Sequence, residues 1–109
     1  MSLTIDWLPK NRRPTHPGEV LRLDVLPELR LTQAEFADHL GITRHRLSEI
    51  LHGKRSVTPD TAMRLARVLG TGPEVWLGMQ QALDLWDALR SPEAKEIAKL
   101  RPIRKSAAA

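Results

Sequence analysis

Basic side chains are concentrated in one short part of this 109-residue chain. Residues 41–55 carry four lysines and arginines against one acidic residue, whereas residues 17–40 carry two against five, so the net charge of +4 is locally concentrated. Arginine, histidine and glutamate can contact base edges, while threonine, glutamine and lysine can hold phosphates. The candidate DNA-binding residues are Gln33, Thr43, Arg44, His45, Arg46, Glu49, Lys54 and Arg55.

A short helix is predicted immediately before the basic residues. Thr32 stands three positions before Glu35, which is the spacing of a capping box at a helix start. Gly41 supplies a left-handed residue where the helix ends. The apolar face of this helix consists of Phe36, Ala37 and Leu40.

A second short helix is predicted to carry most of the basic residues. Thr43 is its cap and Gly53 ends it. Its apolar residues lie on one side only, at Leu47, Ile50 and Leu51. Two such helices joined by a tight turn form a helix-turn-helix, here about residues 32–52, whose second helix enters the major groove of DNA.

The position of each candidate on this second helix indicates its contact with DNA. Arg44, His45 and Glu49 lie at the start or on the outer side, where they would reach base edges. Gln33, at the start of the preceding helix, would meet the DNA backbone. The remaining candidates are expected to contact phosphates and are Thr43, Arg46, Lys54 and Arg55.

The rest of residues 17–90 also follows a helical pattern, so we predict an all-α, five-helix DNA-binding domain. The first helix should begin at Pro17 and be halted by Pro27. A fourth helix is predicted from Thr58 and Pro59 to Gly70, with apolar residues at Ala62, Leu65, Ala66 and Leu69.

The last helix of the domain, predicted for residues 73–90, carries more apolar residues than one side can bury. An operator with two half-sites requires a two-fold symmetric protein. We therefore expect this helix to form a homodimer, through Trp76, Met79, Leu83 and Trp86.

The two ends of the chain differ from the domain. Residues 1–16 contain two prolines and are expected to form an irregular arm, whose apolar residues can dock on the domain. Residues 91–109 form a basic tail, in which Ser91 and Pro92 start a short helix that Pro102 stops. The final residues of the tail should be disordered.

Other function classes find little support. The chain has no cysteine, and His45 and His52 stand two helical turns apart, so we expect no metal and no other cofactor. No assembled nucleophile, base and orienting group suggests an enzyme. The chain has no apolar run long enough for a membrane span or a signal peptide, which favours a cytoplasmic protein.

The stretch "TQAEFADHLGITRHRLSEILHGKRSVTPDTAMRLARVLG" resembles the lambda-repressor-like (XRE) helix-turn-helix family. The segments "HPGEVLRLDVLPELRLTQ" before it and "TGPEVWLGMQQALDLW" after it are similar to the HigA (VapI) antitoxins of that family. The resemblance implies a lambda-repressor-like fold and a dimer that represses its own operon. It also implies a partner, a ribonuclease toxin of the RelE or HigB type. The alternative is a stand-alone transcriptional regulator without a toxin.

Overall fold

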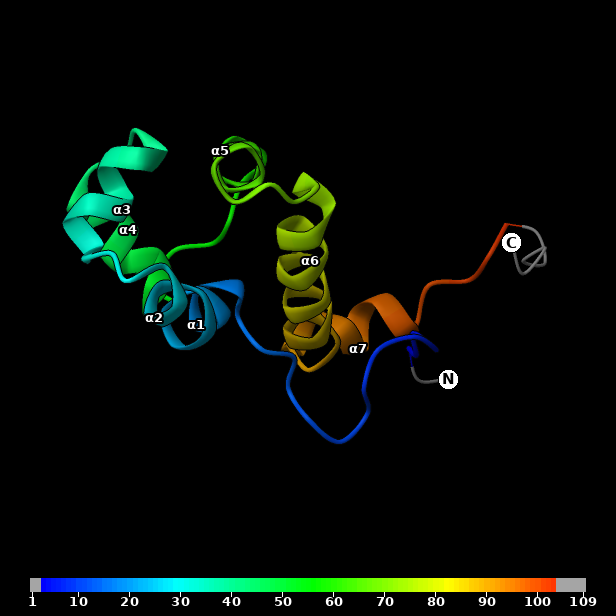
Figure 1. Cartoon of the computed structure of the whole chain (residues 1–109). Helices are drawn as coiled ribbons and strands as arrows, with labels where there is room; N and C mark the ends of the chain where they lie inside the picture. The colour runs from blue at the N-terminus through cyan, green and yellow to red at the C-terminus, as the bar shows by residue number, and fades with distance from the viewer. Residues whose placement is uncertain (1–2, 104–109) are drawn as a thin grey trace.

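The computed structural model describes residues 3–103, and all regular structure in that part of the chain is helical (Figure 1). The predicted all-α class is therefore confirmed. The predicted disorder at the C-terminus falls largely on residues 104–109, which lie outside the described residues. In chain order the elements are α1 (Pro17–Val20), η1 (Leu21–Val25), α2 (Leu26–Leu29), α3 (Gln33–Leu40), α4 (Arg44–Leu51), α5 (Pro59–Leu69), α6 (Pro73–Leu89) and α7 (Pro92–Ala98).

The first helical segment continues past Pro27, so the prediction that this proline halts it was wrong. The turn η1 is a π-helix, in which the Leu26 N–H donates to the carbonyl of Leu21 instead of to the carbonyl four residues back. In a regular α-helix the ring of a proline clashes with the carbonyl of the residue four positions before it. The wide π turn that precedes Pro27 relieves such crowding. The segment ends at Arg30, which adopts a left-handed conformation with φ of 56°.

One hydrophobic core holds the first helical segment, α3, α4, α5 and the start of α6 together. Its fully buried large side chains include Leu21, Phe36, Leu47, Ile50 and Leu65. These apolar positions recur every three or four residues in each helix, so each short helix contributes one stripe to the core. Burial of these stripes stabilises helices that would be too short to persist alone.

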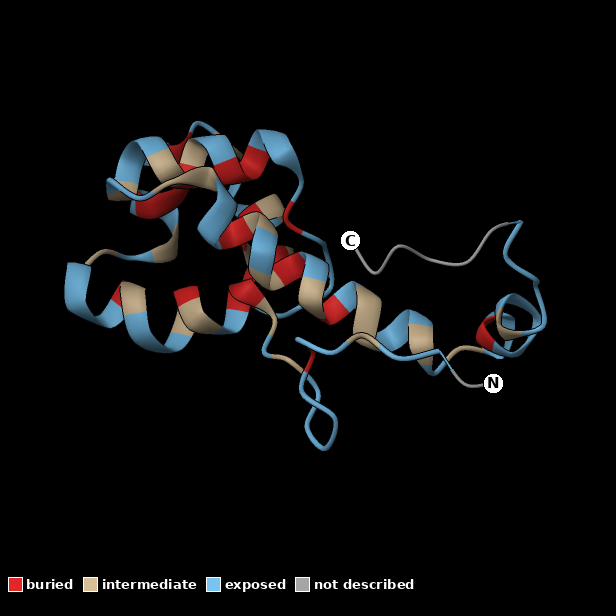
Figure 2. Ribbon diagram, turned by 90° about the vertical axis from the view of Figure 1, so that its right-hand side faces the viewer, coloured by how far each residue is buried: buried red, intermediate tan, exposed pale blue. Residues whose placement is uncertain are grey.

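The fourth predicted helix is confirmed as α5. The hydroxyl of Thr58 caps it and Gly70 ends it with φ of 75°. The longer α6 packs against α5 and extends away from the core (Figures 1 and 2). Gln80 is buried on α6, and its side-chain oxygen accepts a hydrogen bond of 2.9 Å from the Val57 N–H, which fixes α6 to the segment before α5.

The arm and α7 lie at the far end of α6, which gives the molecule an elongated shape of 51 × 25 × 22 Å. Leu8 of the arm is buried, and Arg13 donates two hydrogen bonds of 2.9 Å to Asp87 of α6. The predicted short helix after Ser91 is present as α7, although the Ser91 hydroxyl donates to the Ala88 carbonyl rather than capping α7. None of the helices described is long and apolar enough to cross a membrane.

Candidate nucleic-acid interface

Local side-chain caps define both helices of the helix-turn-helix. The Thr32 hydroxyl accepts the Glu35 N–H at 3.1 Å, and the Glu35 carboxylate accepts the Thr32 N–H at 2.9 Å, so the predicted capping box is present. These bonds hold the pKa of Glu35 below its usual value. Gly41 is left-handed with φ of 68°, and the Thr43 hydroxyl accepts the Arg46 N–H at 3.0 Å. The turn between α3 and α4 is therefore fixed by bonds within a few residues of it.

The first residues of α4 project into solvent. Arg44 is exposed, and the side chain of His45 is 83% exposed. Gln33 is half-buried at the start of α3, while Thr43 is exposed and keeps its hydroxyl hydrogen free to donate, because the oxygen serves as acceptor in the cap. A duplex laid against this end of α4 would first meet these side chains.

Arg46 lies against α5, although it was predicted to contact phosphate. Its Nη2 donates to Asp60 at 3.0 Å and to the hydroxyl of Thr61 at 2.8 Å. Only 30% of the side chain is exposed. The guanidinium therefore fastens α4 to the start of α5, and any contact with DNA must use its other N–H groups.

Arg64 of α5 holds the turn of the helix-turn-helix from the other side. Its Nη1 donates to the carbonyls of Leu40 and Gly41 at 2.9 and 3.2 Å, and its Nε donates to Asp60 at 2.9 Å. Hydrogen bonds from Arg64 and then Arg46 hold the pKa of Asp60 below its usual value. Asp60 thus links the turn to α4, and it was not predicted as part of the site. The spacing of Asp60 and Arg64, four residues apart on a helix, was the available sequence signal.

Glu49 and Arg55 contact each other. Nε and Nη2 of Arg55 donate to Oε1 of Glu49 at 3.0 and 2.7 Å, and this pair lowers the pKa of the Glu49 carboxyl. His45 lies farther from the same oxygen, with Nε2 at 3.7 Å. Lys54, between the loop glycine and Arg55, is exposed. The structure thus brings a predicted base-reading residue and a predicted phosphate-binding residue together as one ion pair.

The start of α1 and the residue before it support the end of α4, and no simple sequence signal identifies this contact. A β-carbon added at Gly18 would lie 1.7 Å from the carbonyl oxygen of Ile50, so only glycine permits this approach. Nδ1 of His16 accepts the Gly18 N–H at 2.9 Å, and its ring lies 3.8 Å from where a β-carbon of Gly53 would be. Burial is the main cause that lowers the pKa of His16.

Two of the four residues predicted for the dimer interface face the interior of the subunit. Trp76 is 4% exposed and its indole N–H donates to the Thr71 hydroxyl at 2.9 Å, while Leu83 is 2% exposed. Both side chains are therefore buried within the single subunit, and Trp76 belongs to its hydrophobic core. Met79 and Trp86 are half-buried.

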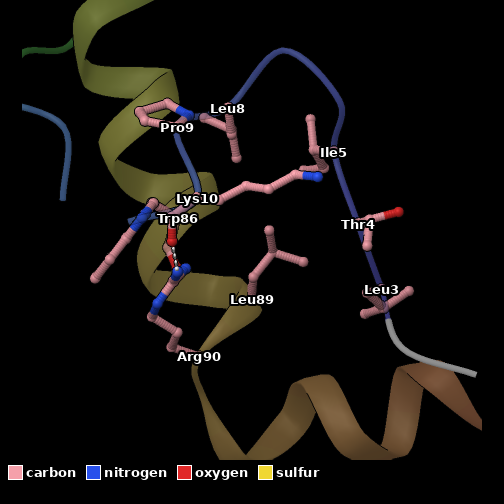
Figure 3. A pocket seen from close by; sticks show the side chains of 9 residues that line it. All are labelled: Leu3, Thr4, Ile5, Leu8, Pro9, Lys10, Trp86, Leu89 and Arg90. Carbon is pink, nitrogen blue, oxygen red and sulfur yellow. Dashed lines mark hydrogen bonds between the residues drawn. The ribbon is translucent and has the colours of Figure 1, made fainter. Parts of the chain in front are cut away.

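Trp86 lies where the arm crosses α6. The guanidinium of Arg90 stacks on its ring at 3.5 Å from the centroid and also donates to the Lys10 carbonyl at 3.1 Å (Figure 3). A cavity of about 380 Å³ separates the arm from this end of α6, and it is lined mainly by apolar side chains, among them Leu8 and Leu89. The arm thus covers the last turns of α6.

Comparison with known proteins agrees with this architecture. The helix-turn-helix family model matches residues 23–76. Antitoxin HigA-1 of Vibrio cholerae is 38% identical over 76 residues, which cover 70% of this chain and 71% of that protein. The structure of a HigA-family addiction module antidote protein from Coxiella burnetii has 41% sequence identity and a TM-score of 0.75, covering 84% of this chain and 99% of that one.

A third relative was solved with DNA. The structure of antitoxin GraA in complex with its operator has 34% identity and a TM-score of 0.76, and the match covers 89% of this chain and 98% of that one. The likeness extends over the arrangement of helices as well as the sequence, and most of each relative is covered. The chain therefore belongs to the HigA antitoxins of the helix-turn-helix family.

Proposed function

We propose that this protein is a sequence-specific DNA-binding antitoxin that represses its own operon and neutralises a ribonuclease toxin of the RelE or HigB type. The observation that carries the proposal is the exposed start of α4, where Arg44 and His45 project from a helix that α5 holds rigidly. A relative with the same arrangement of helices has been solved with its operator. This function requires the cytoplasm, where operator DNA is accessible.

In this proposal α4 lies in the major groove and α3 crosses the backbone. Arg44 and His45 contact base edges, because they lie at the exposed start of α4. Phosphates meet the Thr43 hydroxyl and the Lys54 ammonium on either side of the helix, together with Gln33 at the start of α3. Arg46 contributes mainly by fastening α4 to α5.

The second subunit of the repressor would bind the open α6 face, which we define as Val75, Gly78, Met79, Ala82 and Leu85. These residues recur at helical spacing and carry no charge. Val75 is 45% exposed, and a β-carbon at Gly78 would meet no atom within 4 Å. A second copy packed here would give the two-fold symmetry that a palindromic operator requires. The toxin would bind a separate surface of the same dimer.

The test combines DNA binding with toxin neutralisation. The purified protein is titrated against a duplex from its own promoter and against a scrambled duplex, and it is co-expressed with the product of the adjacent reading frame. We expect preference for the promoter duplex and rescue of growth from the toxic neighbour. Promoter binding without any effect on a neighbouring toxin would instead identify a stand-alone regulator, and no promoter preference would contradict the proposal.

A further inference from the structure

The ion pair between Glu49 and Arg55 bears on how the protein contacts DNA. We propose that Glu49 is a positioning residue, which holds the Arg55 guanidinium in one orientation for the operator backbone instead of reading a base itself. This inference rests on the proposed DNA-binding function. It assigns the two residues a joint role, in which the arginine makes the contact and the carboxylate orients it.

The geometry of the pair leaves the guanidinium free to bind a second partner. Arginine has five N–H groups, and the two bonds to Glu49 Oε1 use one on Nε and one on Nη2. Both N–H groups of Nη1 and one of Nη2 remain. The Arg55 side chain is 48% exposed and the Glu49 side chain 28%, so the arginine is the more accessible partner of the pair. A phosphate approaching from solvent meets the cation first.

The main chain that carries Arg55 is also fixed. At the end of α4 the Lys54 N–H donates to the Glu49 carbonyl at 2.8 Å and the Gly53 N–H donates to the Ile50 carbonyl at 3.1 Å. These two bonds form a Schellman motif, which Gly53 permits with φ of 72°. The motif turns the chain back so that Arg55 reaches Glu49 on the last turns of the helix. The His16 ring packs beside the same glycine.

An arginine restrained at both its backbone and its side chain loses less conformational freedom on binding than a free one. A carboxylate without that role would only repel phosphates. The two roles predict opposite changes in operator affinity when Glu49 is removed. Affinity falls if the carboxylate positions Arg55, and it rises if the carboxylate only repels DNA. The loss of affinity caused by removing Glu49 must also depend on Arg55, since Glu49 has nothing to position without it.

A double-mutant cycle tests this dependence. Glu49→Ala, Arg55→Ala and the double variant are titrated against the promoter duplex and a scrambled duplex, with circular dichroism to monitor folding. We expect Glu49→Ala to weaken binding to both duplexes about tenfold when Arg55 is present, because a phosphate contact is weakened on either sequence. In the Arg55→Ala background the same change should leave promoter binding unchanged or tighter. Glu93→Ala on α7 removes an exposed carboxylate far from α4 and should have little effect.

Two results would overturn the inference. Equal weakening by Glu49→Ala with and without Arg55 would show that Glu49 contacts the operator directly. Tighter binding to both duplexes in both backgrounds would show that it only repels DNA. The wild-type protein separates this inference from the proposed function: if it prefers the promoter duplex and no coupling is found, the positioning role alone fails. If the wild type shows no preference, the DNA-binding function fails as well.

Discussion

The α-carbon of Gly18 lies against the main-chain carbonyl of Ile50, where a β-carbon would be 1.7 Å from the carbonyl oxygen. We expect Gly18→Ala to lower the free energy of unfolding by about 1–3 kcal/mol, because α1 must move away from the end of α4. Urea unfolding measures the loss. Glu19→Ala changes the exposed neighbour in the same helical turn and should cost less than about 0.5 kcal/mol. Equal stability of Gly18→Ala and wild type would show that the contact yields easily.

Arg44 and Lys54 are expected to contribute differently to DNA binding. Arg44→Ala should weaken the free energy of operator binding by about 1–3 kcal/mol and relax the sequence preference at one base pair, because a base contact is lost. Lys54→Ala should weaken binding to the operator and to the scrambled duplex similarly, because a phosphate contact is lost. The slope of the logarithm of the binding constant against the logarithm of the salt concentration should become shallower by about one unit. Salt titrations of both variants on both duplexes measure this. An equal loss for Arg44→Ala on the two duplexes would make Arg44 a backbone contact.

The open α6 face predicts which substitution separates the subunits. Gly78→Lys should give a folded monomer, because the helix has room for the side chain and a buried charge opposes association. Sedimentation equilibrium should give about twice the 12.3 kDa chain mass for the wild type and the single mass for the variant. Met63→Lys is the control, since Met63 is an apolar residue of α5 that is 63% exposed. Dissociation by Met63→Lys alone would place the dimer interface on α5.

His16 should make stability depend on pH. Its pKa lies below the usual 6.5, mainly because of burial, with Arg13 acting in the same direction and with the Arg55 carbonyl, Asp84 and Glu19 opposing it. Between the lowered pKa and 6.5 the unfolded chain binds more protons than the folded one. The stability that neutral His16 contributes to the folded protein is therefore fully present above pH 6.5, and it is lost as the pH falls through the folded-state pKa.

His16→Asn provides the test of this pH dependence. Asparagine preserves an acceptor for the Gly18 N–H but does not titrate. We expect the variant to lose less stability than the wild type between about pH 7.5 and pH 5, measured by urea unfolding. The same slope in both proteins would show that other groups cause the dependence.

Local signals in the sequence were sufficient for the helix-turn-helix. The capping box of Thr32 and Glu35 and the cap at Thr43 act within three residues, so their spacing alone predicted where α3 and α4 begin. The glycines that end α3 and α5 were predicted as helix ends on the same basis, and both are left-handed in the structure. The rule for Pro27 is equally local but failed, because a wide π turn accommodates the proline inside the helical segment.

Whether a candidate side chain is free or already paired depends on contacts between residues that are distant in sequence. Arg46 meets Asp60 fourteen residues later, and only the packing of α4 on α5 brings them together. The apolar pattern of α6 predicted a surplus of apolar surface, but its register on the domain decides that Trp76 faces inward. Composition and spacing determine helices because their hydrogen bonds are local. Tertiary packing decides which side chains remain free to bind DNA, because it brings some charged groups beside a partner, as it does Arg46 and Asp60.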